Sequence, residues 1–128
     1  MKGTIIGDII GSPYEFVGQP VKSKTFAWFT PACHVTDDTV TTLAVAAALQ
    51  EGKETRGGYI GPLRRQLKHW CRMYPDAGFG ARFTQWFLSD ETEPYGSYAN
   101  GAAMRVAPAA WVGQSLDEVQ ALAEITAL

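Results

Sequence analysis

Residues 36–49, with the sequence TDDTVTTLAVAAAL, place four polar side chains directly in front of an alanine-rich apolar run. The run from Val40 to Leu49 contains no glycine or proline, and alanine is the best helix former. It therefore predicts a helix over about residues 37–50, with Gly52 as its C-terminal stop. Because alanine side chains let neighbouring helices approach closely, we expect this helix to be central in the fold.

The polar segment Thr36–Thr39 has two interpretations. In the first, Thr36 caps the helix, and Asp37 and Asp38 interact favourably with the positive end of the helix dipole. In the second, the oxygens of these residues are ligands of a hard cation such as Mg²⁺, since adjacent carboxylates repel each other unless a positive charge lies between them. The pattern of these four residues alone favours capping.

The N-terminal segment GTIIGDIIGS, residues 3–12, carries glycines four residues apart. This spacing predicts a helix with a bare glycine stripe beside an isoleucine face, and we expect that helix to be buried and to end at Ser12-Pro13. Asp8 would lie on this helix. Because burial of an unpaired carboxylate is costly, Asp8 needs polar partners.

Glu15 follows this helix and is flanked by Tyr14 and Phe16. Aromatic neighbours predict that Glu15 is partly buried, where it would need a hydrogen-bond donor, a cation or a proton. The simpler alternative is a salt bridge to Lys22 or Lys24.

Helical spacing of apolar residues predicts further helices along the chain. One begins with Pro62 in its first position and ends near Tyr74. A short aromatic helix covers residues 79–87, and Pro108 kinks or ends a helix that starts near residue 101. Ser115 and Glu118 form a capping box for a last helix that reaches the C-terminus. No stretch alternates as a strand, so the fold class is all-α.

The segment from Gly96 to Gly101 is a small-residue loop that opens into a helix. Backbone N–H groups at such a helix start bind phosphate well. The loop lacks the glycine spacing of a P-loop or a dinucleotide fingerprint, so a simple capped loop is the alternative.

Composition excludes several classes of function. The 128 residues predict one domain, with 46% hydrophobic residues and a net charge of −2. No basic block indicates nucleic-acid binding, and no apolar run is long enough for a signal peptide or a membrane span. Cys33 and Cys71 lack metal-type spacing. They fit either one disulfide or the reduced thiols of a cytoplasmic protein, and the second case is the commoner.

Three segments together resemble the ADP-ribosylglycohydrolase family, which includes dinitrogenase reductase-activating glycohydrolase and the ADP-ribosylhydrolases. They are residues 3–16, the Thr36–Thr39 segment with its alanine-rich helix, and residues 96–108. The resemblance spans essentially the whole chain. It implies hydrolysis of the glycosidic bond between ADP-ribose and an acceptor, carried out by an orthogonal bundle of helices around a dinuclear Mg²⁺ or Mn²⁺ site.

The resemblance also implies roles for individual residues. Thr36, Asp37 and Asp38 are implied as metal ligands, and Glu15, Asp37 and Asp38 as the catalytic group. The residues implied to bind ADP-ribose are Gly96, Ser97, Tyr98, Asn100 and Gly101.

One departure from the family concerns the metal site. Family members supply a further Asp-x-Asp-Thr group from a late helix, whereas the only aspartates after Asp38 are Asp76, Asp90 and Asp117. We therefore expect residues 1–128 to be a single truncated domain that binds metal weakly and has little or no hydrolase activity alone. We also expect a homo-oligomer or a complementing C-terminal half. The alternative functions are a non-catalytic ADP-ribose- or metal-binding module and a structural homologue of the crystallin type.

Overall fold

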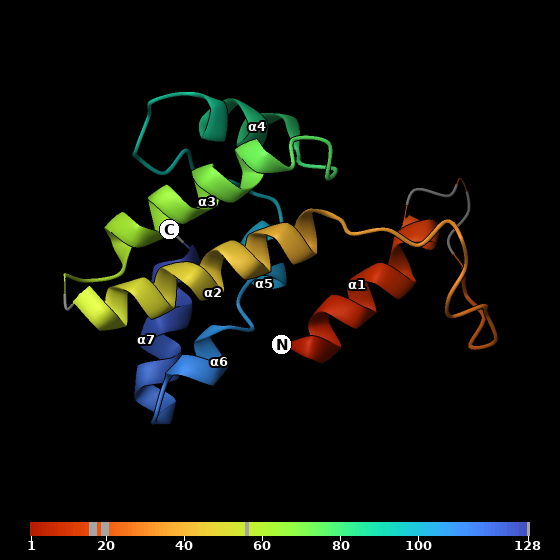
Figure 1. Ribbon diagram of the computed structural model, residues 1–128, viewed down its shortest axis with the longest axis horizontal. Coiled ribbons are helices and arrows are strands. Elements are labelled where there is room, and N and C mark those ends of the chain that lie inside the picture. The colour runs from red at the N-terminus through yellow and green to blue at the C-terminus, as the bar shows by residue number, and fades with distance from the viewer. Residues whose placement is uncertain (16–17, 19–20, 56, 128) are drawn as a thin grey trace.

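The computed structural model describes residues 1–15, 18, 21–55 and 57–127, and the regular secondary structure in this part of the chain is entirely α-helical, with no strand (Figure 1). The all-α prediction is confirmed. Phe16 and Leu128, which belonged to the expectations for Glu15 and for the last helix, lie outside the described residues. The helices are α1 (Lys2–Glu15), α2 (Asp37–Thr55), α3 (Ile60–Met73), α4 (Ala81–Leu88), α5 (Gly101–Met104), α6 (Ala109–Val112) and α7 (Leu116–Ala127).

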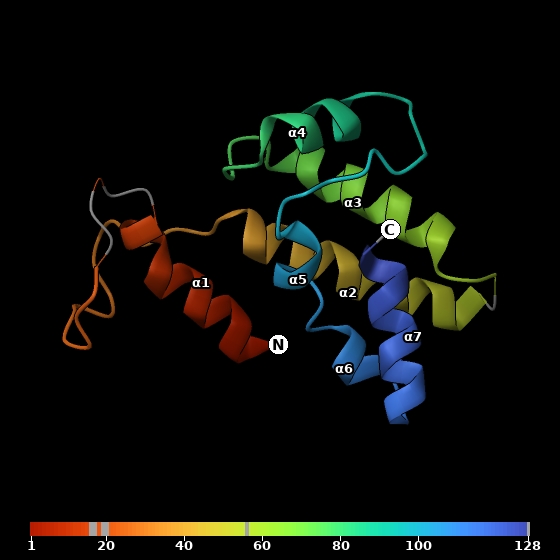
Figure 2. The same cartoon turned by 180° about the vertical axis from the view of Figure 1, so that it is seen from behind.

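Helix α2 occupies the centre of the molecule, as its alanines predicted. Figures 1 and 2 show α3 and α4 on one side of α2, and α6 and α7 on the other. The core therefore forms on both sides of one helix, where small and branched apolar side chains alternate. The buried apolar residues are Val40, Ala44, Val45, Ala48 and Leu49 of α2, packed with Leu63, Leu67, Cys71, Trp86, Phe87, Ala109 and Leu122.

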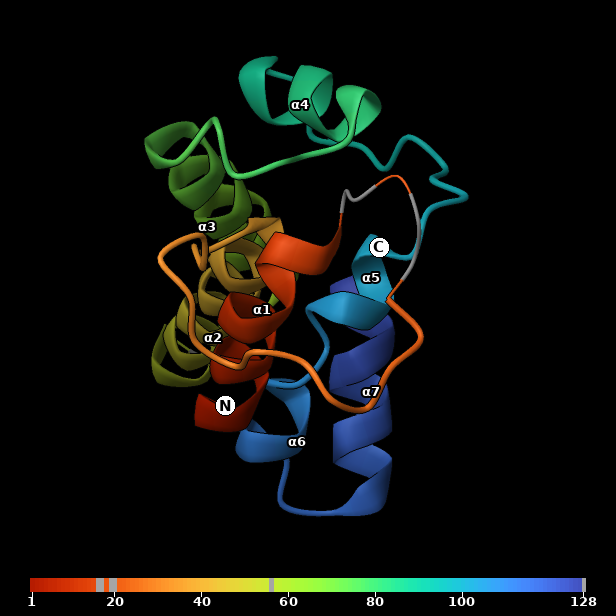
Figure 3. The same ribbon diagram turned by 90° about the vertical axis from the view of Figure 1, so that its right-hand side faces the viewer.

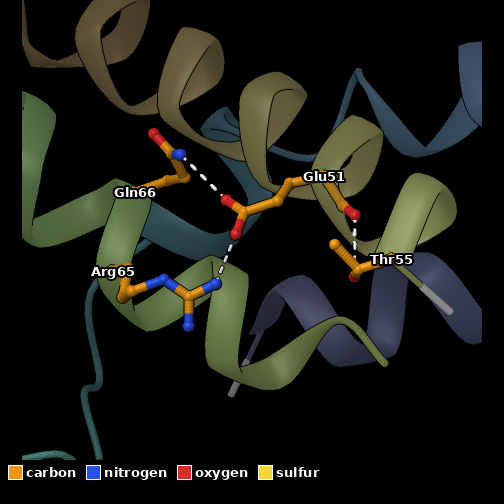
Figure 4. A network of polar contacts seen from close by, with 4 residues as sticks. All are labelled: Glu51, Thr55, Arg65 and Gln66. Atoms are coloured by element: carbon orange, nitrogen blue, oxygen red, sulfur yellow. Dashed lines mark hydrogen bonds and ion pairs between the residues drawn. The ribbon is translucent and has the colours of Figure 1, made fainter. Parts of the chain in front are cut away.

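A polar network joins the end of α2 to the middle of α3 (Figure 4). The Glu51 carboxylate accepts hydrogen bonds from Arg65 and from Gln66 Nε2, the latter at 3.0 Å. Hydrogen bonds from Gln66 and Arg65 hold the pKa of Glu51 below its ordinary value. Thr55 donates to the backbone oxygen of Glu51 at 2.9 Å, which closes the last turn of α2.

Two cations of α3 hold the end of α4. Lys68 Nζ donates to the carbonyls of Trp86 and Ser89 at 2.8 and 2.6 Å, and Arg72 Nε donates to Phe87 O at 2.7 Å. The last carbonyls of a helix have no partner within the helix, and they carry its negative dipole end. Lys68 and Arg72 supply both the donors and the positive charge.

Helix α1 runs through Pro13 to Glu15, so the prediction that it ends at Ser12-Pro13 is wrong. Proline cannot donate to the carbonyl four residues earlier, which is that of Ile9. The Ser12 hydroxyl donates to Ile9 O instead, at 3.0 Å. A local side chain thus satisfies the acceptor that the proline leaves free.

Other helix limits also differ from the expectation, and α4 begins at Ala81 and not at residue 79. Helix α2 continues through Gly52 to Thr55, because this glycine is buried and leaves room for the Tyr59 ring. Helix α3 begins at Ile60, so Pro62 is its third residue and not its first. Its missing N–H is still harmless there, since the first-turn amides have no partner inside the helix.

The C-terminal helices follow the sequence pattern. Helix α5 ends at Met104, and Pro108 precedes the first residue of α6. Ser115 Oγ accepts from Glu118 N at 3.2 Å, and the Glu118 carboxylate accepts from Gln114 N at 2.8 Å. The Ser115 cap is therefore confirmed, whereas the Glu118 carboxylate bonds to the amide before the cap residue and not to that of Ser115 itself.

The glycine stripe of α1 does not face a neighbouring helix. At Gly3, Gly7 and Gly11, an added Cβ would have no heavy atom within 4 Å, and Ser12 is the only buried residue among those described in α1. The prediction of a buried helix is therefore wrong, although the helix itself is confirmed.

Other expectations concern thiols and membranes. Cys33 and Cys71 are both unpaired, and burial raises the pKa of the Cys71 thiol to about 12. Among the described residues, no helix combines the length and the apolar character needed to cross a membrane.

Gly7 has free space around it and Gly52 does not, so substitution by alanine should have opposite effects on the stability of the fold. We expect Gly7→Ala to stabilise the fold by about 0.5–1 kcal/mol, because it raises helix propensity without a clash. Gly52→Ala should destabilise it by about 1–3 kcal/mol, because the new Cβ would overlap the Tyr59 ring. Urea unfolding of the two variants checks this pair. Destabilisation by Gly7→Ala would show that the stripe is packed.

Candidate functional site

The carboxylate of Asp8 joins α1 to the start of α2. Asp8 Oδ1 accepts from Thr36 Oγ1 at 2.5 Å, and Oδ2 accepts from Thr36 N at 3.1 Å and from Thr39 Oγ1 at 2.5 Å. Both threonines are buried. The polar partners that the sequence required for Asp8 are therefore the two hydroxyls of the Thr36–Thr39 segment.

A second contact lies one turn further along α1. The Ser12 hydroxyl oxygen accepts from His34 N at 3.0 Å. Asp8, Ser12 and Glu15 are spaced at i, i+4 and i+7, which places them on one face of a helix. This polar face holds the 34–39 segment against α1 and brings Glu15 towards the aspartates of α2.

Thr36 is the cap of α2, as the first interpretation required. Its Oγ1 accepts from Asp38 N at 3.3 Å, and Asp37 N donates to Ala77 O at 2.8 Å. The carboxylate of Asp37 accepts from its own backbone N–H, which opposes part of its pKa shift. No hydrogen bond from another described residue reaches the carboxylates of Asp37 and Asp38. The confirmed cap is thus compatible with a further role for both aspartates.

The carboxylates of this cluster are close enough to perturb one another. Burial, followed by the charges of Asp38 and Glu15, raises the pKa of Asp37 to about 6. Burial and the charge of Asp8 raise the pKa of Asp38. The pKa of Glu15 is also raised, first by burial and then by the charges of Asp38 and Asp8. His34 opposes this shift at Glu15.

Glu15 differs in part from its expected environment. Its side chain is mostly exposed, and the limited burial of its carboxyl group is still the largest cause of its raised pKa. The alternative salt bridge is wrong, since the ion pairs in the described part of the chain are Arg64–Glu93 and Arg65–Glu51 and do not involve Lys22 or Lys24. Glu15 thus faces other carboxylates without a lysine or arginine partner among the described residues.

A divalent cation fits this cluster in charge and in donor type. The oxygens of Thr36, Asp37 and Asp38 are hard ligands, and a cation would offset the repulsion that raises the pKa values of the carboxyl groups. Among the described residues, however, no three His, Cys, Asp or Glu side chains are grouped so that they could hold a metal ion. Thr36, Asp37 and Asp38 could therefore fill only part of the coordination shell of such a cation.

The Gly96–Gly101 loop forms a separate, solvent-exposed feature. Gly96 has φ +62°, which favours glycine, and the Tyr98 side chain is fully exposed. Ser97 Oγ accepts from Ala99 N at 3.2 Å. Helix α5 has only four residues, so the dipole at its start is weak. No hydrogen bond or ion pair joins this loop to the acidic cluster within the described residues.

Sequence reasoning missed Asp8 and Ser12 as members of this site. The available signal was their spacing to Glu15, two turns and one turn earlier on the same helical face. The glycine stripe favours an apolar face of α1 and competes with this polar spacing in the sequence pattern.

Comparison with protein-family models matches the whole chain, residues 1–128, to the family described as ADP-ribosylglycohydrolase. Comparisons with curated proteins and with solved structures give no match.

The raised pKa of Asp37 predicts a pH-dependent loss of stability. Between its ordinary value of 3.8 and about 6, the folded protein binds more protons than the unfolded chain. The contribution of Asp37 to the free energy of unfolding is therefore greatest below pH 3.8 and is lost as the pH rises through 6. Asp37→Asn should stabilise the fold above pH 6 by about 1 kcal/mol, a figure reduced for solvent screening.

Urea unfolding between pH 4 and pH 8, in buffer containing a chelator, measures this effect. Asp90→Asn, an exposed loop substitution, is the control and should change stability by less than about 0.5 kcal/mol. Equal pH profiles for wild type and Asp37→Asn would contradict the prediction.

Proposed function

The chain belongs to the ADP-ribosylglycohydrolase family, and we propose that it hydrolyses the glycosidic bond of ADP-ribosylated substrates. The observation that carries the proposal is the bonding of Asp8 to Thr36 and Thr39. This contact aligns the end of α1 with the start of α2, so that Glu15, Asp37 and Asp38 form one acidic cluster. Such a cluster suits a reaction in which positive charge develops at the anomeric carbon of ribose.

We assign metal binding to Thr36, Asp37 and Asp38, with Mg²⁺ or Mn²⁺ as the cation. A bound ion would supply orientation of the ribose hydroxyls and activation of water. Glu15 is exposed on the polar face of α1, where it can accept a proton from an attacking water. Its raised pKa makes it a stronger base than an ordinary glutamate.

The Gly96–Gly101 loop is proposed to hold ADP-ribose. Its exposed backbone N–H groups can donate to the diphosphate, as in other glycine-containing anion sites. Gly96 lets the loop adopt its left-handed turn, and the exposed ring of Tyr98 offers an apolar surface to the nucleoside. Ser97, Asn100 and Gly101 complete this assignment.

Non-catalytic binding of ADP-ribose or metal is the second candidate. It is favoured by the incomplete metal group among the described residues. In that case the acidic cluster would still attract a cation, but no water would be activated. A structural role of the crystallin type would require neither ligand.

Calorimetric titration with ADP-ribose, with and without Mg²⁺, separates these functions. We expect Mg²⁺ to strengthen the binding of ADP-ribose. Asp37→Ala should reduce this Mg²⁺-dependent gain in affinity about tenfold, because one metal ligand is lost. Asp117→Ala, at the exposed start of α7, is the control and should behave as wild type. Release of ADP-ribose from a conjugate, reduced by Glu15→Gln, would support hydrolysis. Binding without release would support the second candidate, and the absence of binding would leave the structural one.

We also propose that the chain associates with a second copy or with a complementing segment. Large apolar side chains lie on its surface, among them Phe29 at 70%, Trp111 at 72% and Leu116 at 80% exposure. Exposed apolar surface of this kind is typical of interfaces.

Light scattering tests self-association. The expected result is a mass of at least twice 13.9 kDa at high protein concentration. Trp111→Ser should shift the protein towards the monomer, whereas Gln50→Ser should not. A monomeric mass at every concentration would contradict association between copies.

A further inference from the structure

A cavity of about 460 Å³ lies between the first turns of α2 and the end of α3. Its volume falls in the range of small-molecule binding sites. The segment from Val35 to Leu43 forms one wall, and the segment from Trp70 to Ala77 forms the other. Of the site residues described above, only Thr39 lines it.

The walls are apolar and aromatic. The rings of Trp70 and Tyr74 are stacked, with their centroids 6.3 Å apart and their planes at 24°. Leu43 and Met73 add aliphatic surface, and Asp76 is the only charged residue in the lining. A ligand that matches these walls is flat and apolar, and it carries a positive charge.

The cavity adjoins the acidic cluster. Thr39 lines the cavity, and its hydroxyl donates to Asp8 at 2.5 Å. Ala77 also lines it, and its carbonyl accepts from Asp37 N at 2.8 Å. Figure 3 shows α1 in front of α2, with α3 above α2 in this view.

We propose that this cavity binds a planar, cationic nitrogen heterocycle, such as the ring of a pyridinium-type ADP-ribose conjugate, which leaves as the neutral base when that conjugate is hydrolysed. The assignment of the heterocycle as a leaving group rests on the proposed function, whereas its binding does not. Trp70 and Tyr74 contact the ring by stacking, and cation–π attraction is strongest for tryptophan. Asp76 supplies the complementary charge at the rim.

The hydrolysis of such a conjugate needs no reactant other than water. The oxygen of water bonds to the anomeric carbon of ribose, and the bond from that carbon to the ring nitrogen breaks. The bonding electron pair returns to the ring nitrogen, so the heterocycle leaves as a neutral molecule. The water loses one proton to a base, for which Glu15 is available. The products are ADP-ribose and the neutral heterocycle.

The same walls disfavour a guanidinium ligand. Guanidinium groups bind best to carboxylates in a paired, bidentate arrangement, with acceptors for their remaining N–H groups. The cavity offers one carboxylate and the hydroxyls of Thr39 and Tyr74, and Thr39 is already bonded to Asp8. An aromatic cation needs only the ring faces and one opposite charge.

Two probes of nearly equal shape and different charge test the proposal. They are the N-methylnicotinamide cation and neutral nicotinamide, titrated calorimetrically into the full chain. We expect the cation to bind about fivefold or more tightly than the neutral ring, since a cation–π contact adds about 1 kcal/mol. Asp76→Asn should remove most of this preference, and Trp70→Leu should weaken binding of both probes.

Matched controls are Asp90→Asn and Trp28→Leu, because both residues are exposed and lie outside the cavity. Each should bind the probes as wild type does. If Trp70→Leu fails to fold, Asp76→Asn still decides, since Asp76 is exposed on a turn. Equal affinity of wild type for the two probes, tighter binding of methylguanidinium, or an unchanged preference in Asp76→Asn would overturn the proposal.

Incubation with NAD⁺ then separates the binding of a heterocycle in the cavity from the proposed hydrolytic function. Release of nicotinamide that is lowered by Asp76→Asn supports both of them. Probe binding without release of ADP-ribose from NAD⁺ or any other conjugate supports the cavity and overturns the hydrolytic function. Hydrolysis of another conjugate without probe binding supports the hydrolytic function and overturns the proposal for the cavity.

Discussion

The hydrogen bonds to Asp8 are the constraint on which the rest of the site depends. Helix α1 buries only Ser12 among its described residues, so apolar packing cannot hold it in place. Its position is set by one carboxylate that accepts from Thr36 and Thr39 and by one serine that accepts from the His34 amide. Hydrogen bonds to a charged group are worth about 1.5–3 kcal/mol each, so these few contacts can fix a helix that packs poorly.

This arrangement has an electrostatic cost, which the core must offset. Holding α1 against α2 brings Glu15 close to Asp37 and Asp38, and their mutual repulsion and partial burial raise all three pKa values. The apolar packing on both sides of α2 provides the stability that tolerates this repulsion. Perturbed carboxylates gathered at a helix start are more typical of functional sites than of structural ones. A cation at the cluster would relieve the strain and strengthen the contact between the two helices.

Local signals predicted the helices well, because capping, proline and apolar spacing act within a few residues. The cap at Thr36, the break before Pro108 and the cap at Ser115 all follow from such signals. The errors arose where a distant contact changed the local outcome. Gly52 does not end α2, because Tyr59 packs against it. The glycines of α1 suggested burial, but the helix is attached through its polar face.

For the candidate site, the sequence by itself determined which side chains are available: the Thr36–Thr39 segment, Glu15 and the Gly96–Gly101 loop. It also determined that they lie on helices or at helix starts, since this depends on neighbouring residues alone. Only the tertiary structure decided that Asp8 and Ser12 are the contacts that align them, and that a cavity lined by Trp70 and Asp76 adjoins the cluster. Those relations join residues far apart in the chain. They depend on the angle and separation of packed helices, which no local pattern encodes.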